Sequence, residues 1–409
     1  SLGCPEPTTA YFPSCWRAGE IIAERCLSEG NSETLCQTRE LEARNNYLAL
    51  GPSGYLAIPG AEIEDWYDSG QCKDCFIPSF NYRPAGSGQY ALSITNFEQE
   101  KPKRFRFGFI ASSDNHRARP GTGYKEKDRF VTTEANGPSS EAIAEVLYPK
   151  SFPDSKSIDF GGREGLIDMG FRAFEVERQA SFFTSGGLAA VHSSGRDRQS
   201  IWDSMKRKET YGTSGDRILL WFDLINGEER IPMGGEISTT ENPQFFVKDI
   251  GALKQKPGCP DYSDTKITRE DIKRICKNEC YNPSDERNII TRIEVIKVSP
   301  QINPGEKVDN LIEDPWKVIE CPLDQNGCEV SFEDTSYSEN QRDVSFYIRA
   351  IQEPSPSVNA KNIRCEYNKK GECIKVNMCY GDNRTAKDDD CLSMIEERAW
   401  SSPIYVDYL

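Results

Sequence analysis

The step Ser-Ser-Asp114-Asn-His116 carries the residue types best suited to chemistry in this sequence. A carboxylate and an imidazole two residues apart on an extended backbone share one face, so both can be directed at one or two metal ions. These ligands suit zinc, manganese or iron, and such an ion lowers the pKa of a bound water and polarises a phosphoryl or acyl oxygen. The alternative is that His116 caps a turn and Asp114 accepts backbone hydrogen bonds, because this spacing is common by chance.

Three further residues are candidates for contact with a small anionic ester. Arg117 could bind phosphate through two N–H groups, and the alternative is a solvated surface arginine. His192 ends a second apolar stretch and could face the same edge as the metal pair; otherwise it is a structural histidine. Arg196 precedes a helix whose N-terminus could hold an anion, and the alternative is a simple helix cap by Asp197. We therefore predict His192, Arg117 and Arg196 as catalytic or substrate-contacting residues.

Other motifs limit the competing mechanisms. Only two histidines, His116 and His192, are present, so no convincing Ser-His-Asp or Cys-His triad can be assembled. The acidic loop at residues 382–390 resembles a calcium loop but lacks the central glycine and closing glutamate of an EF-hand. A solvated acidic loop is favoured there, and a calcium-dependent binding module is the weaker alternative.

The elements that would position these residues follow two different patterns. Residues 105–113 are expected to be a buried strand, and residues 186–192 a second strand that leads into a helix over residues 198–208. This alternation of strand, loop and helix predicts an α/β domain over residues 1–215, with ligands at the strand ends. Short strand-like runs separated by Pro, Asn and Gly then predict an antiparallel, sandwich-like β domain over residues 216–409.

The 15 cysteines bound the cellular compartment. Only Cys72 and Cys75 have the C-x-x-C spacing that zinc or iron–sulfur sites use in pairs. Most cysteines are therefore expected to form disulfides in a periplasmic or extracellular protein, with one left over from the odd count. The local pairs that we expect are Cys26–Cys36, Cys321–Cys328, Cys365–Cys373 and Cys379–Cys391.

The charge balance and hydropathy exclude some partners. Acidic residues number 65 and basic residues 50, which gives a net charge of −15. A field of this sign repels phosphate backbones, so no nucleic-acid partner is expected. The most apolar run, residues 217–223, is much shorter than the roughly 18 residues that a membrane span needs, so no span is expected.

Several blocks of sequence occur in an order that carries a family resemblance over nearly the whole chain. They are residues 107–116, 186–192, 201–215 and 398–405, with Arg25-Cys26 and residues 70–83 typical of a cysteine-bearing subgroup. Together they resemble a large bacterial family related to the PHP (polymerase and histidinol phosphatase) metallo-phosphoesterases. The resemblance implies part of a distorted β/α barrel over residues 1–215, with a metal cluster at the strand ends. Asp114 and His116 would match the family's last ligand motif.

This chain departs from the family pattern in its first part. It has no H-x-H strand and no histidine before His116, so it resembles only the C-terminal portion of such a protein. The missing ligands are expected from an N-terminal fragment of the same precursor. We therefore expect the C-terminal portion of a secreted or periplasmic metal-dependent hydrolase, phosphoesterase-like, that uses divalent zinc, manganese or iron. The alternative is a non-catalytic binding or structural subunit of an extracellular assembly.

Overall fold

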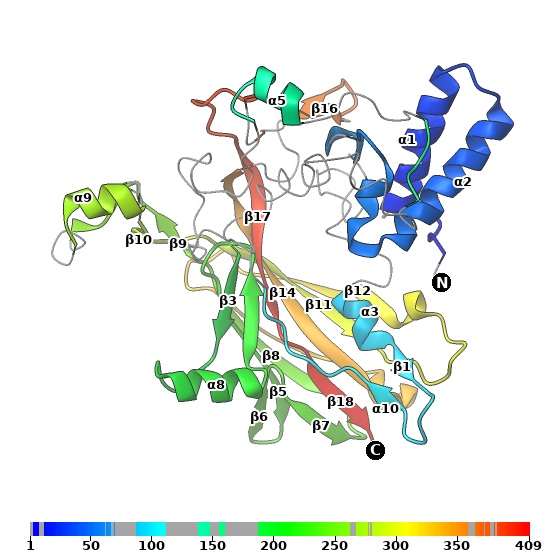
Figure 1. Cartoon of the computed structure of the whole chain (residues 1–409). Coiled ribbons are helices and arrows are strands. Elements are labelled where there is room, and N and C mark those ends of the chain that lie inside the picture. Colours follow the sequence, from blue (N-terminus) through cyan, green and yellow to red (C-terminus); the bar gives the residue numbers. More distant parts are fainter. Residues whose placement is uncertain are drawn as a thin grey trace. The chain divides into compact units, whose positions relative to one another are not determined.

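The computed structural model of the chain forms two units, each described here by itself (Figure 1). Unit 1 comprises residues 1–87, 128–184 and 356–395, and unit 2 comprises residues 88–127, 185–355 and 396–409. Among the described residues, no helix is both long enough and apolar enough to cross a membrane. The structure describes residues 3–7, 12–61, 63–66, 69, 87–111, 138–147, 155–159, 187–261, 267–276, 278, 280–358, 365–371, 373–376, 380 and 383–409.

Unit 1 is built on a pair of helices, α1 (Ser14–Ser28) and α2 (Glu33–Ala49). Gly30, at φ +78°, ends the first helix, and the side chain of Ser32 caps the second by accepting from the backbone N–H of Leu35. The expected disulfide Cys26–Cys36 joins the two helices across this turn. Smaller elements complete the unit: η1 (Gly51–Ala57), η2 (Ile63–Trp66), α5 (Glu141–Leu147), β15 (Cys365–Tyr367) and β16 (Cys373–Val376).

Unit 2 consists mainly of two antiparallel sheets. The large sheet has eight strands in the order β12-β11-β14-β17-β4-β3, with β18 paired to β14 and β7 paired in parallel to β18. The small sheet has the order β13-β8-β5-β6. The strands are β3 (Leu188–Val191), β4 (Thr210–Thr213), β5 (Leu219–Asn226), β6 (Glu229–Pro232), β7 (Glu236–Thr239), β8 (Gln244–Ile250), β11 (Ile290–Val298), β12 (Ile312–Glu320), β13 (Cys328–Glu333), β14 (Val344–Val358), β17 (Leu392–Ser401) and β18 (Ile404–Tyr408).

Helix α8 (Arg198–Lys206) connects β3 to β4. The Thr268 side chain caps helix α9 (Arg269–Asp271) by accepting from the amide of Asp271. Shorter elements complete unit 2. They are α3 (Gly88–Ser93), β1 (Thr95–Asn96), β2 (Lys103–Arg104), α8 (Arg198–Lys206), β9 (Leu253–Gln255), α9 (Arg269–Asp271), η7 (Ile272–Cys276), β10 (Pro283–Arg287), η8 (Val308–Leu311) and α10 (Tyr337–Asn340).

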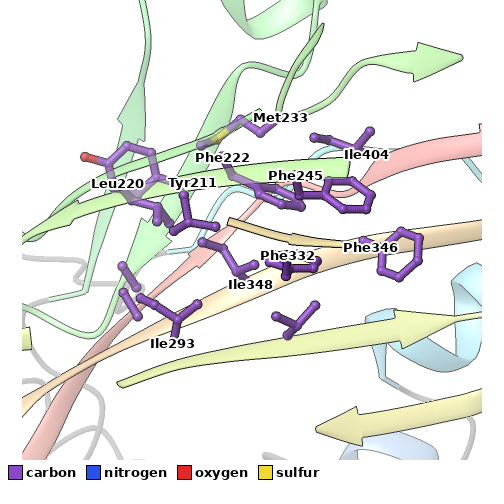
Figure 2. Packing of buried hydrophobic residues seen from close by; sticks show 14 of the residues in the cluster. Tyr211, Leu220, Phe222, Met233, Phe245, Ile293, Phe332, Phe346, Ile348 and Ile404 are labelled. Atoms are coloured by element: carbon purple, nitrogen blue, oxygen red, sulfur yellow. The ribbon is translucent and has the colours of Figure 1, made fainter. Parts of the chain in front are cut away.

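One apolar core joins the two sheets, and its residues come from strands of both (Figure 2). Strand β5 alternates between buried and more exposed positions, as a strand covered on one face must. Phe245 of β8 stacks on Phe222 at 5.4 Å and on Phe332 of β13 at 4.9 Å between ring centroids. Each fully buried side chain of this size contributes about 1.5–3 kcal/mol to stability. The expectation of antiparallel β sheets is confirmed, although the large sheet also takes in β3 and β4, which precede residue 216.

The predicted β/α barrel is not found: no barrel is closed among the described residues, which are mainly β. The strand–helix–strand segment β3-α8-β4 was expected to follow α/β rules, yet β4 pairs antiparallel with β3, and Val191 lies opposite Thr210. The short helix α8 returns the chain beside the strand that it left, so the crossover that parallel strands require is never made. The predicted strand at residues 186–192 and helix at residues 198–208 are found as β3 and α8, whereas residues 210–213, expected to lie in a turn, form the strand β4.

Most of the described cysteines form disulfides, as expected from the sequence. Cys321–Cys328 is confirmed, and Cys4–Cys15 and Cys259–Cys280 join pairs that were not predicted. Cys276 is a free cysteine. Of the other expected pairs, Cys391 is disulfide-bonded, whereas Cys379 and the side chains of Cys365 and Cys373 lie outside the described residues. These bonds are consistent with an oxidising compartment.

Candidate functional site

The three residues Asp114, His116 and Arg117 lie outside the described residues, so the site is built from the segment that leads to them. Residues 105–111 were expected to form a buried strand, and they are instead a chain without strand pairing, in which Phe105 is 57% exposed. Side chains replace the missing ladder. The amide of Phe109 donates to the hydroxyl of Ser402 at 2.8 Å.

Tyr405 gives this segment a second attachment. Its hydroxyl donates to the carbonyl of Phe107 at 2.7 Å and accepts from the amide of Phe107 at 2.8 Å. Burial raises the pKa of Tyr405, so the hydroxyl remains protonated and able to donate at any ordinary pH. The backbone of residue 107 is therefore satisfied entirely by one side chain of strand β18.

Two glycines let the segment lie directly against the protein beside strand β4. A Cβ at Gly212 would stand 2.3 Å from the Cβ of Ala111, and one at Gly108 would stand 2.8 Å from the Cβ of Lys208. Gly108 thus lies against Lys208, and Ala111, further along the segment, lies against Gly212, further along β4. The segment therefore runs in the same direction as β4 and reaches Ala111 near the end of β4 that carries Thr213.

That end of β4 is polar. The amide of Ser214 donates to the carbonyl of Arg398 at 2.9 Å, and the amide of Arg398 donates back to the Ser214 hydroxyl at 2.9 Å. The same hydroxyl donates to the carboxylate of Glu397, whose residue is only 1% exposed. The hydroxyl of Thr213 is buried and makes no hydrogen bond to the described residues. The sequence analysis missed Ser214 and Glu397, because only long-range pairing of β4 with β17 brings them together.

His192 lies at the opposite end of β4. Its amide donates to the carbonyl of Glu209 at 2.9 Å, and the ring nitrogen Nε2 lies 2.7 Å from the carbonyl oxygen of Leu220. Because a carbonyl oxygen only accepts, Nε2 carries the hydrogen, and Nδ1 keeps the lone pair of the neutral ring. The rings of Tyr211 and Trp221 lie beside the imidazole, at 5.5 and 5.7 Å. The ring is thus held in one orientation, and Nδ1 is the atom that can accept a proton or a metal.

Arg196 is exposed just before helix α8. Asp197 caps this helix: it accepts from the amide of Ser200 at 3.0 Å and from the Ser200 hydroxyl at 2.5 Å. These bonds, led by that of the hydroxyl, lower the pKa of the Asp197 carboxyl. The simpler interpretation, a helix cap by Asp197, is therefore confirmed, while the role of Arg196 toward substrate stays a prediction.

Asp249 of β8 is a buried acid that the sequence analysis did not single out. It is 0% exposed, and neither carboxyl oxygen has a hydrogen-bond partner among the described residues. Burial raises its pKa well above the ordinary value, which keeps the carboxyl neutral. Burial also raises the pKa of the neighbouring Tyr211 to about 12. The alternation Phe245, Val247, Asp249 did contain a signal, because every second residue of β8 points into the core.

The described residues contain no group of three His, Cys, Asp or Glu that could hold a metal ion. Asp114 and His116 supply the oxygen and nitrogen donors that a divalent ion prefers, but two ligands are fewer than protein metal sites use. The predicted centre therefore needs further ligands besides this pair.

Comparisons with known proteins give one partial likeness. No curated protein and no solved structure matches the chain. The relation to the PHP metallo-phosphoesterases stays a prediction, because the description of the matching family states no activity. Residues 92–224, about a third of the chain and the part that contains every predicted site residue, match the family described as a protein of unknown function, DUF3604.

Proposed function

We propose that this chain is the C-terminal portion of a periplasmic or extracellular metal-dependent hydrolase that acts on small phosphate esters or similar anionic esters. One observation carries the proposal: residues 105–111 are fixed along β4 and lead toward its polar end, where Ser214 and Glu397 lie. Three Cα–Cα steps lead from Ala111 to Asp114, and consecutive Cα atoms are about 3.8 Å apart. The covalent chain thus limits Asp114 to within about 11 Å of Ala111.

The chemistry follows from the donor types. Asp114 and His116 would hold a zinc, manganese or iron ion, with the remaining ligands supplied by an N-terminal fragment of the same precursor. Such an ion, when bound, supplies Lewis acidity and an acidified water. Arg117 would bind the phosphate oxygens through two parallel N–H groups. The disulfides support the oxidising compartment in which we place the enzyme.

His192 and Arg196 are proposed as further substrate contacts, with a condition on substrate size. They lie beyond the Thr210 end of β4, and the metal pair is proposed beyond the Thr213 end. Three strand steps separate these ends, which is about 10 Å. The ring of His192 also lies beside Tyr211, on the face of β4 opposite to the one that carries Gly212 and residues 105–111. A substrate that reaches both ends of β4 must therefore extend beyond a single phosphate group and around the edge of the sheet. His192 would act through Nδ1, because Nε2 is held by Leu220.

The test is hydrolysis of para-nitrophenyl phosphate and bis(para-nitrophenyl) phosphate by the chain purified together with its N-terminal fragment. Asp114→Ala and His116→Ala should each lower turnover by about 100-fold or more, because each removes a ligand of the ion that activates water. Asp203→Ala is the matched control, since the Asp203 side chain is exposed on α8 and accepts a hydrogen bond from the side chain of Gln199 on the same helix. Equal turnover in all four proteins would end the proposal.

The second candidate is a non-catalytic binding or structural subunit. It is favoured by the structural roles of two residues near the predicted site: His192 bonds a backbone carbonyl, and Asp197 caps a helix. Native mass spectrometry with and without reductant separates the two candidates. A stable, metal-free chain that purifies alone supports the subunit, and co-purification with a histidine-rich fragment supports the hydrolase.

A further inference from the structure

Three arginines lie close together on the large sheet, and two of them form ion pairs with carboxylates. Arg292 donates two hydrogen bonds to Glu396, at 2.7 and 3.0 Å. Arg349 pairs with Glu294 at 2.8 Å and also bonds the carboxylate of Asp314. Paired N–H donation of this kind satisfies both the charge and the planar geometry of a guanidinium.

The third arginine, Arg398, is different. Among the described residues its guanidinium makes one long hydrogen bond, from Nε to the backbone carbonyl of Glu396 at 3.4 Å, and no ion pair. Burial, and then the neighbouring charge of Arg349, lower its pKa, and the charges of Glu294, Glu396 and Glu397 offset this only in part. A guanidinium has five N–H donors, and the described residues accept only from Nε of Arg398. The N–H groups on its two Nη atoms make no hydrogen bond to the described residues.

The position of Arg398 relates it to the proposed metal pair. Its backbone bonds Ser214, the residue that follows β4. Trp400, two residues further along β17, packs in a cluster with Phe107 and Phe109 of the segment that leads to Asp114. Residues two apart on a strand project from the same face, so Arg398 and Trp400 share the face on which this segment lies. The segment also reaches Ala111 beside Gly212, the position next to Ser214 on that face.

We propose that Arg398 binds the phosphoryl group of the substrate, as a tetrahedral oxyanion site at the Ser214 end of β4. The proposal rests on the proposed hydrolase function, and it adds a residue that lies far from the D-x-H step in sequence. The planar guanidinium can donate two parallel N–H bonds to two oxygens of one phosphate, which an ammonium cannot do. An anion held there would also give Arg398 the direct ion pair that it does not make with the described residues.

The experiment is isothermal titration of the full chain with inorganic phosphate at constant ionic strength. The parent chain should bind phosphate, and Arg398→Ala should weaken the affinity by about 10- to 100-fold, the range expected for a charge-assisted hydrogen bond. Arg398→Lys should fall between the two, because lysine keeps the charge and loses the paired geometry. Arg230→Ala is the control: Arg230 is 57% exposed and pairs with Asp223 on the small sheet.

Two results would overturn the proposal: no phosphate binding by the parent chain, or unchanged affinity in both Arg398 variants. Should Arg398→Ala fail to fold, Arg398→Lys decides alone, since it preserves the charge and most of the packing. Turnover of Asp114→Ala and Arg398→Ala, measured beside the phosphate titration, separates the two claims. Phosphate binding that depends on Arg398 in a protein whose turnover ignores Asp114 would keep the anion site and reject the hydrolase. Turnover that needs Asp114 and ignores Arg398 would do the reverse.

Discussion

Two regions of unit 2 differ in whether their buried ionisable side chains have partners. On β11, Lys297 is 7% exposed and its Nζ lies 2.6 Å from Oδ2 of Asp334, which is 0% exposed. The other oxygen of Asp334 accepts from the amide and the hydroxyl of Ser336, at 3.1 and 2.7 Å. The ring of Trp316 lies 5.2 Å from Nζ. Charge in this region is therefore fully partnered inside an aromatic core, as buried ions must be.

Beside β4 the opposite holds. Asp249 has no hydrogen-bond partner among the described residues, and Arg398 has no carboxylate partner there. The ion pair near Lys297 joins the two sheets, whereas the buried Asp249 carboxyl and the Arg398 cation are without such partners among the described residues. A protein keeps such groups where a ligand completes them, and that is our account of Arg398. We have no corresponding account of Asp249, whose carboxyl has no partner among the described residues. The comparison predicts opposite signs for mutations in the two regions.

The largest effect is expected at the partnered pair. Lys297→Met removes the cation and leaves Asp334 buried without it, which should lower the free energy of unfolding by about 3–5 kcal/mol. Lys248→Met is the matched control, because Lys248 pairs with Glu329 on the exposed face of the small sheet and should cost less than about 1 kcal/mol. Chemical denaturation of both variants measures the difference. Similar losses in the two would show that the buried pair is not special.

The next effect has the opposite sign and depends on pH. Because burial raises the pKa of Asp249, its carboxyl is neutral in the folded protein but ionises on unfolding above about pH 4. Its contribution to stability is thus greatest in acid and is lost as pH rises toward the raised pKa. Asp249→Asn cannot ionise, so the variant should gain on the parent by at least about 1 kcal/mol between pH 4 and pH 7. A difference that does not change with pH would mean that Asp249 is charged in the folded state.

The smallest effect concerns the arginines. Arg292→Met loses two bonds to Glu396 and should destabilise the protein by about 1 kcal/mol. Arg398→Met loses one long bond and an uncompensated charge, so the unfolding free energy without ligand should change by less than about 0.5 kcal/mol. Thermal melts in phosphate-free buffer compare the two variants. A larger loss for Arg398 than for Arg292 would reveal a structural role.

The sequence predicted the sandwich and two disulfides because their signals are local. Alternation in β5 gives the buried face directly, and Cys26–Cys36 and Cys321–Cys328 close short loops. The prediction of a barrel was wrong because a pattern of strand, helix and strand does not determine whether the second strand pairs parallel or antiparallel to the first.

The prediction of a buried strand at residues 105–111 was wrong for a related reason. Its backbone partners are the side chains of Ser402 and Tyr405, about 300 positions later, and no local pattern announces them. The Ser214–Glu397 contact and the isolation of Arg398 are equally long-range. What could be predicted of the site was therefore the residue types that suit a metal, and not the polar strand end toward which they lead.

The most direct test of the central claim, that Asp114 and His116 together hold an ion, is the metal content of the chain purified with the N-terminal fragment that we propose. Elemental analysis by mass spectrometry should find zinc, manganese or iron bound to the parent protein. Asp114→Ala and His116→Ala should each reduce that metal to the background level, and Asp203→Ala should retain it. Equal metal in the parent and both site variants would contradict the account.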